Sequence, residues 1–147
     1  MTLLEQAIHF RKVFFQEILN NLSRYGFIKK KLWDMQVRLI HEEASEFLVA
    51  AEECFADPEN PKRREELVKE LSDLVFVCYQ FAATYNIDLD SAMDRVYESN
   101  LSKLDEHGKP IYRADGKVLK GPNYKPADMT GCIPEATNPN YYDTNGK

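Results

Sequence analysis

The sequence predicts an all-α fold, and three observations support this prediction. Apolar residues before residue 105 recur at intervals of three and four, the period of amphipathic helices. Nothing in that stretch has the alternating pattern of a strand. Five of the six glycines and five of the seven prolines come after residue 100, where loop should replace helix. We therefore expect a four-helix bundle followed by an irregular Gly/Pro-rich C-terminal segment.

The first two predicted helices are separated by Gly26. The residues Thr2 and Glu5 form a capping-box pattern at the start of the first helix, and Gly26 marks its expected end. The second helix is expected from about residue 31 to residue 55. Its apolar stripe consists of Ile40, Ala44, Phe47, Leu48, Ala51 and Phe55.

Two further helices follow a break at residues 57–61. Asn60 can cap the third helix, with Pro61 at its first position, and this helix should run to about Tyr85. Asp88 or Asp90 can cap the fourth helix, and Gly108 should end it. The third helix is apolar nearly all round and needs cover on several sides. We therefore expect the bundle to be completed by oligomerisation, as a homodimer or homotetramer (dimer of dimers).

Length and composition limit the class of protein. A chain of 147 residues fits one domain over residues 1–128, with a helical core at about 2–105, a loop block at 106–128 and a tail at 129–147. A net charge of −5 argues against a nucleic-acid partner. The longest apolar runs are too short for a membrane span, and no secretory signal precedes them, so we expect a cytoplasmic protein.

Four acidic residues carry the strongest chemical signal. Glu43 and Glu46 are three residues apart on the second predicted helix, and Glu70 and Asp73 are three apart on the third, so each pair shares a helix face. Glu43 and Glu70 lie within or beside the apolar stripes, where carboxylates are rare unless they are paired or bind metal. The same faces do not carry enough lysine or arginine to neutralise all four acids.

This pattern favours a hard divalent cation, Mg²⁺ or Mn²⁺, with oxygen ligands. The alternative is that the acids form solvated helix faces. Other sites are excluded by missing motifs: there is no Glu-x-x-His, His-Glu-x-x-His, P-loop or Gly-x-Gly-x-x-Gly pattern.

The acids and a later block together resemble a known family. Glu42-Glu43-x-x-Glu46, separated by 23 residues from Glu70-x-x-Asp73, is similar to the acid motifs of MazG-like nucleoside triphosphate pyrophosphohydrolases. The family is also described as phosphoribosyl-ATP pyrophosphohydrolase-like. The segments 99–104, 108–110 and 115–124 resemble the C-terminal block of its phage and bacterial members. The resemblance covers about residues 35–128.

The resemblance implies roles for individual residues. Glu43, Glu46, Glu70 and Asp73 would hold Mg²⁺ and form the catalytic centre, with Glu42 either supporting them or simply exposed. Asn100 and Lys103 would contact the sugar or phosphates of the nucleotide. Lys120 belongs to a basic loop that is a candidate for closing over the phosphates. Trp33 is a candidate for stacking on the base, with packing at the start of its helix as the alternative.

The resemblance also implies the reaction. It would be the hydrolysis of a (deoxy)nucleoside triphosphate to a monophosphate and pyrophosphate, in the host cytoplasm if the chain is phage-encoded. A purine substrate such as dGTP or GTP is the first expectation. House-cleaning of modified nucleotides and hydrolysis of phosphoribosyl-ATP are alternatives within the class. Outside it, the chain could be a non-catalytic helical dimer that binds a partner, or a sensor that binds metal or nucleotide without turnover.

Overall fold

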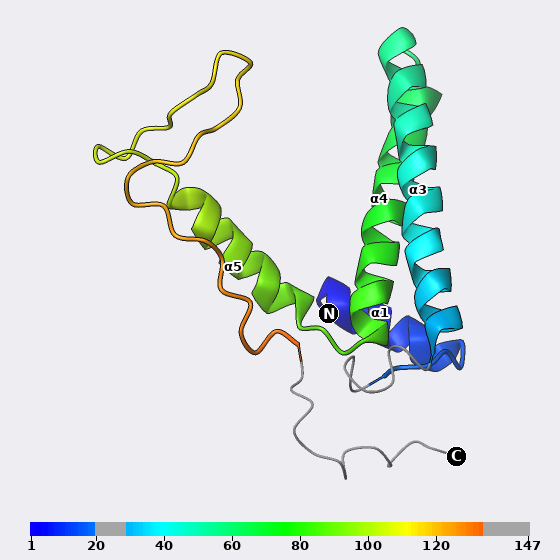
Figure 1. The fold of residues 1–147 in the computed structure, drawn as a ribbon. Helices are drawn as coiled ribbons and strands as arrows, with labels where there is room; N and C mark the ends of the chain where they lie inside the picture. The colour runs from blue at the N-terminus through cyan, green and yellow to red at the C-terminus, as the bar shows by residue number, and fades with distance from the viewer. Residues whose placement is uncertain (20–28, 134–147) are drawn as a thin grey trace. The chain divides into compact units, whose positions relative to one another are not determined.

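A computed structural model describes residues 1–19 and 29–133. This part of the chain contains the helices α1 (Leu3–Val13), α3 (Lys30–Ala56), α4 (Pro61–Thr84) and α5 (Leu89–Leu101) (Figure 1). Its only β-type pairing is one isolated bridge between Tyr112 and Val118. The predicted all-α class is therefore confirmed. In the described ranges, no helix combines the length and the apolar character needed to cross a membrane.

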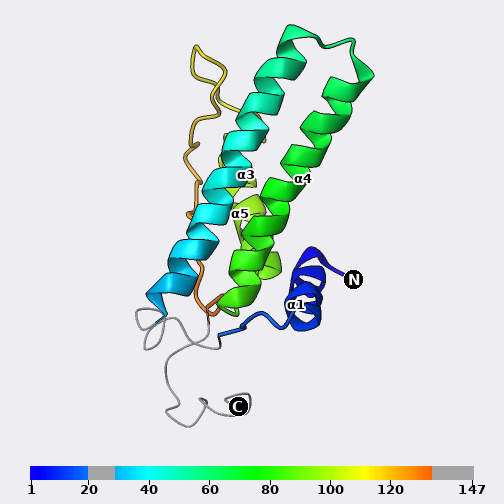
Figure 2. The same cartoon turned by 90° about the vertical axis from the view of Figure 1, so that its right-hand side faces the viewer.

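The described residues form two compact units, residues 1–87 and 88–133. In the first unit, α3 and α4 lie side by side as an antiparallel hairpin, and α1 packs on α4 (Figure 2). Asn60 begins α4 as predicted, because its side chain accepts a hydrogen bond from the Lys62 amide at 3.0 Å and Pro61 occupies the first turn. The capping box of Thr2 and Glu5 is also present.

The first helix ends much earlier than the sequence predicts. α1 stops at Val13, whereas the predicted end, Gly26, lies outside the described residues. Phe15 has a positive φ of 51°, and the amide of Gln16 donates to the carbonyl of Arg11 at 2.8 Å. This is the Schellman arrangement that closes a helix, here with phenylalanine where glycine is usual. The apolar residues at 14–19 therefore do not extend the helix.

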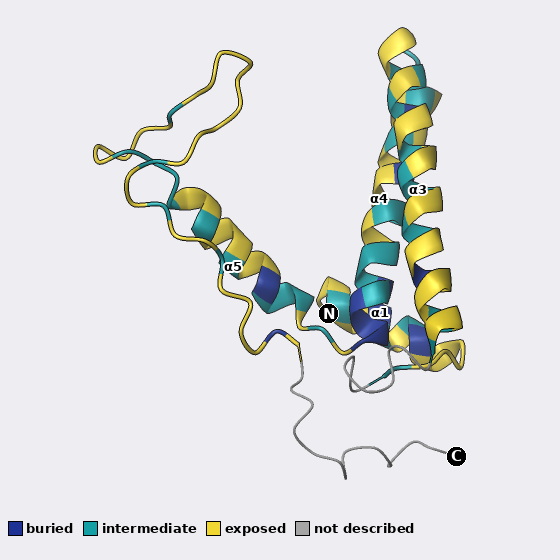
Figure 3. Ribbon diagram, in the orientation of Figure 1, coloured by how far each residue is buried: buried dark blue, intermediate teal, exposed yellow. Residues whose placement is uncertain are grey.

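The first unit has a small-residue core with polar groups inside it. The buried apolar residues of this unit are Ala7, Ala50, Ala82, Ala83 and Tyr85. Arg11 is also buried, and its guanidinium donates to Gln80 Oε1 at 3.3 Å and to the Glu17 carbonyl at 2.8 Å. Much of the outer surface of α3 and α4 is exposed (Figure 3). The third predicted helix, α4, is therefore not covered on all sides within one chain.

In the second unit, a loop segment is tied along α5. Ser99 Oγ donates to the Lys125 carbonyl at 2.7 Å, and the Lys125 amide donates to Ser102 Oγ at 2.9 Å. Arg95 donates to the carbonyls of Asp128 and Thr130 at 2.7 and 2.6 Å. These bonds join the end of the helix to residues far along the chain.

Only the start of α5 lies where the sequence predicts it. Asp88 caps its start, accepting from the Ser91 amide at 3.1 Å, as one of the two predicted caps. The helix ends at Leu101 rather than at Gly108. The Gly121 amide donates to the Lys103 carbonyl at 2.9 Å, and the loop thereby satisfies a carbonyl that a longer helix would have used.

Candidate functional site

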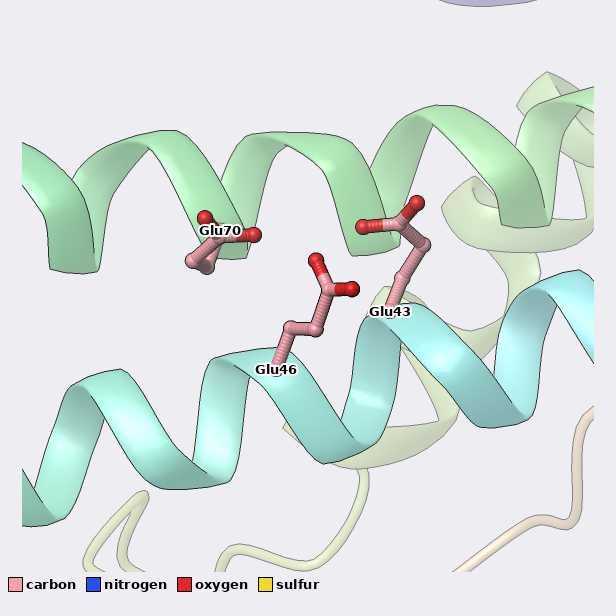
Figure 4. A group of neighbouring side chains, drawn as sticks. All are labelled: Glu43, Glu46 and Glu70. Carbon is pink, nitrogen blue, oxygen red and sulfur yellow. The ribbon is translucent and has the colours of Figure 1, made fainter.

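Three of the four predicted acids converge between α3 and α4. Glu43 and Glu46 extend from α3 and Glu70 from α4, and all three carboxylates point into the space between the helices (Figure 4). Each offers one oxygen, and these three oxygens lie within 4.8 Å of one another. The spacing of three residues on α3 places its two acids on the face that packs against α4. We call these three residues the acid cluster.

Burial makes the acid cluster electrostatically costly. Glu70 is buried, Glu43 is half-buried and Glu46 is exposed. Glu43 Oε2 and Glu70 Oε2 are both shielded from solvent, and no described residue hydrogen-bonds to either. Desolvation, followed by repulsion from Glu46, Asp73 and Glu70, raises the pKa of Glu43 above its ordinary value. The cluster thus gathers negative charge, and two of its shielded oxygens have no donor among the described residues.

The fourth predicted ligand, Asp73, lies beside this cluster. It contributes to the raised pKa of Glu43, but its oxygens are not among the three that converge. Asp73 Oδ2 instead lies 2.9 Å from Lys69 Nζ, which also lies 2.9 Å from Glu70 Oε1. One basic residue therefore lies beside two of the four acids, which is fewer positive charges than full neutralisation requires. The signal was present in the sequence, because Lys69 and Asp73 have the i,i+4 spacing of a helix ion pair.

A pocket of about 350 Å³ adjoins the acid cluster within the same unit. Glu46 and Glu70 belong to both, so the pocket opens directly onto two of the three carboxylates. Arg63 bridges the two helices near this pocket, with Nη1 2.5 Å from Glu53 Oε2 and 3.3 Å from Glu66 Oε2. The pocket is lined by Ser45, Glu46, Val49, Ala50, Glu53, Glu66 and Glu70.

Two other predicted residues of the first unit have structural contacts. Trp33 packs edge-on against Phe81, with ring centroids 5.1 Å apart, and against Tyr85 at 5.2 Å. This matches the packing alternative, and base stacking by Trp33 stays a prediction. Glu42 is exposed and lies 3.9 Å from Arg38, so it does not join the acid cluster.

The remaining predicted residues lie in the second unit. Lys103 lies two residues beyond the end of α5, and its Nζ donates to Asn100 Oδ1 at 2.7 Å. Lys120 is exposed, with its ammonium 4.5 Å from the ring centroid of Tyr124. Contact of these residues with a nucleotide stays a prediction.

The acid cluster fits a divalent cation on its own chemistry. All the donors are carboxylate oxygens, the ligands that Mg²⁺ and Mn²⁺ prefer. The two solvent-shielded oxygens of Glu43 and Glu70 have no described partner, which is costly for buried carboxylates unless a cation compensates them. The solvated-face alternative does not explain this, because solvated acids would have both oxygens in water.

The described helices give an all-α fold in which three acids converge between α3 and α4, and comparison with known sequences identifies the family of the chain. The profile of the family "phosphoribosyl-ATP pyrophosphohydrolase" matches residues 9–100. A phosphoribosyl-ATP pyrophosphatase of Bacillus cereus (strain Q1) is 31% identical over 99 residues, covering 67% of this chain and 81% of the relative. The chain therefore belongs to the phosphoribosyl-ATP pyrophosphohydrolase family, within the MazG-like all-α pyrophosphohydrolase superfamily.

The family match covers most of the predicted site residues and indicates the class of activity. The matched range contains Trp33, the four acids and Asn100, and it ends before Lys103 and Lys120. Membership indicates a nucleotide pyrophosphatase. The family is typically metal-dependent, in agreement with the acid cluster.

Proposed function

We propose that this protein hydrolyses a nucleoside triphosphate to the monophosphate and pyrophosphate, using Mg²⁺ or Mn²⁺ held by Glu43, Glu46, Glu70 and Asp73. The observation that supports this most directly is the pair of buried, unpartnered oxygens on Glu43 and Glu70. A divalent cation bound there would neutralise the triphosphate and lower the pKa of an attacking water. In the balanced reaction, a water oxygen bonds to one phosphorus of the α–β anhydride, the bond from that phosphorus to the bridging oxygen breaks, and the water proton passes to solvent.

The residues of the chain have separate tasks in this proposal. Glu43 extends from α3 and Glu70 from α4, and together they would hold the cation between the two helices. Glu46 is the exposed member of the acid cluster and also lines the adjoining pocket, so it is open to substrate and water. We assign to Asn100, Lys103 and Lys120 the contacts with the sugar and phosphates, and to Trp33 a contact with the base.

A purine triphosphate is the proposed substrate class, with dGTP or GTP as the first candidate. This candidate follows from the resemblance to phage nucleotide-pool enzymes. Phosphoribosyl-ATP is the second candidate, and the name of the Bacillus cereus relative supports it. Both are purine triphosphates, so one assay can compare them directly.

We further propose that the active form is a homodimer or a dimer of dimers. Large apolar side chains along α3 and α4 are exposed in the single chain, including Phe55 at 89% and Val68 at 63%. Large apolar side chains that a single chain leaves exposed are covered in a protein interface when they form a patch, and this supports the proposal. Light scattering coupled to size exclusion should give a mass of two or four chains, and a monomer at micromolar concentration would contradict this proposal.

The test of the function is metal-dependent pyrophosphate release across a panel of NTPs, dNTPs, modified dNTPs and phosphoribosyl-ATP. We expect one purine triphosphate to dominate, turnover to stop with chelator, and Glu46→Gln to be inactive. Glu52→Gln, an exposed acid on the same helix, is the matched control and should behave as wild type. Preference for a modified nucleotide would favour house-cleaning. No hydrolysis of any member would favour a binding or sensing role.

A further inference from the structure

Lys69 is a single cation shared by two of the four predicted metal ligands. Its ammonium lies 2.9 Å from Glu70 Oε1 and 2.9 Å from Asp73 Oδ2. Lys69 and Glu70 differ in exposure, because the Lys69 side chain is 63% exposed and that of Glu70 only 11%. An exposed lysine thus reaches back from the surface to a buried carboxylate.

This contact divides the four acids into two sets. Glu43, Glu46 and Glu70 converge on one point, whereas Asp73 is turned toward Lys69 and does not join them. Glu70 belongs to both sets, since Oε1 faces Lys69 while Oε2 is buried and has no partner among the described residues. One side of the cluster is therefore neutralised, and the other side presents bare oxygens.

We propose that Lys69 is a built-in counter-ion that holds Glu70 and Asp73 while the metal is absent and competes with the divalent cation for their oxygens. An ammonium and a dication at neighbouring positions repel each other. Binding of the cation therefore releases Lys69 from Asp73, and Asp73 becomes free to join the other three ligands. This accounts for the position of Asp73, which faces Lys69 rather than the point where the other three acids converge. The inference rests on the proposed metal-dependent function.

The test measures Mn²⁺ binding directly, by isothermal titration calorimetry without nucleotide. Lys69→Met removes the counter-ion, and Lys62→Met removes an exposed charge from the same helix away from the acids. We expect Lys69→Met to bind Mn²⁺ about tenfold more tightly than wild type, because a nearby positive charge is lost. Lys69→Arg and Lys62→Met should stay within about twofold of wild type.

A second readout concerns the protein without metal. With chelator present, Lys69→Met should unfold at a lower temperature than Lys62→Met, because the acids then repel one another without compensation. Lys69→Gln serves as a second neutral variant, and circular dichroism verifies that each variant is helical.

Mn²⁺ affinity that is unchanged or weaker in both folded neutral variants would overturn the counter-ion role. If wild type binds Mn²⁺ and these variants match it, only this inference fails and the proposed metal centre stands. If wild type binds no Mn²⁺, both fail.

Discussion

The α3–α4 hairpin and the unit formed by residues 88–133 differ in whether key polar side-chain atoms have hydrogen-bond partners. In the second unit, the side chains of Ser99, Ser102 and Arg95 all bond to the backbone of the loop that follows α5. In the hairpin, Glu43 Oε2 and Glu70 Oε2 are shielded from solvent and have no described partner. Satisfied polar groups explain how a segment is held in place. Two shielded carboxylate oxygens without a donor, by contrast, favour a bound cation, and this difference distinguishes the proposed site from the scaffold.

The largest expected effect comes from neutralising a buried member of the acid cluster. Glu70→Gln keeps the size of the side chain and removes its charge, so a divalent cation loses one ligand. We expect pyrophosphate release to fall at least about a hundredfold, with the helical circular dichroism spectrum retained. Glu65→Gln, an exposed acid on the same helix, is the control. Full activity in Glu70→Gln would show that the unpartnered oxygen of Glu70 does not mark the catalytic metal site.

Metal should stabilise the protein through the hairpin. At about 100 times its Kd, a cation that binds only the folded state adds about 2.7 kcal/mol. For a chain of this size, the melting temperature should rise by about 5–10 °C in differential scanning calorimetry. Chelator should reverse the rise, and Glu43→Gln should abolish it. A rise of the same size in Glu43→Gln would locate the metal elsewhere.

A substitution in the second unit should affect stability and spare metal binding. A Cβ added at Gly121 would lie 2.4 Å from the Leu104 carbonyl oxygen and 2.6 Å from that of Lys103. Because both are backbone atoms, Gly121→Ala should destabilise this unit by about 1–3 kcal/mol. Hydrogen exchange should increase in residues 88–133, with Mn²⁺ affinity unchanged. Loss of Mn²⁺ binding in this variant would contradict the assignment of metal binding to the α3–α4 hairpin alone.

The smallest effect is a difference in pH dependence. The raised pKa of Glu43 means that the folded, metal-free protein holds this proton more tightly than the unfolded chain, whose value is near 4.5. Stability should therefore fall as pH rises from about 4.5 through the raised pKa. Glu43→Gln should remove this slope in urea titrations at several pH values, and a slope that persists in the variant would assign it to another group.

Asp88, Asp115 and Asp128 in the second unit should act in the opposite direction. Hydrogen bonds from Ser91, Arg113 and Thr130 respectively lower their pKa values below the ordinary 3.8. The stability they contribute is present above 3.8 and is lost as pH falls through the lowered values. Acid titration of wild type should therefore show both trends, in separate windows.

The features that the sequence predicts well are local ones. Asn60 before Pro61, and Thr2 with Glu5, specify helix starts through bonds within three residues. The approach of Glu43, Glu46 and Glu70 is also predictable, because their positions beside the apolar stripes turn them toward the neighbouring helix.

The features that the sequence does not predict depend on distant residues. α1 ends at Val13 in a closure around Arg11, whose side chain is bound to Gln80 on α4. The end of α5 depends on Gly121, eighteen residues beyond Lys103. Lys69 is different: its spacing to Asp73 is local, but only the packed hairpin shows that it shares Glu70 with the acid cluster.

The central claim is that the acid cluster holds a divalent cation. A crystal soaked in Mn²⁺ and measured near the manganese absorption edge tests it most directly. We predict an anomalous difference peak between Glu43, Glu46 and Glu70, with Asp73 turned toward it and Lys69 displaced. A peak elsewhere, or none at this position at millimolar Mn²⁺, would contradict the claim.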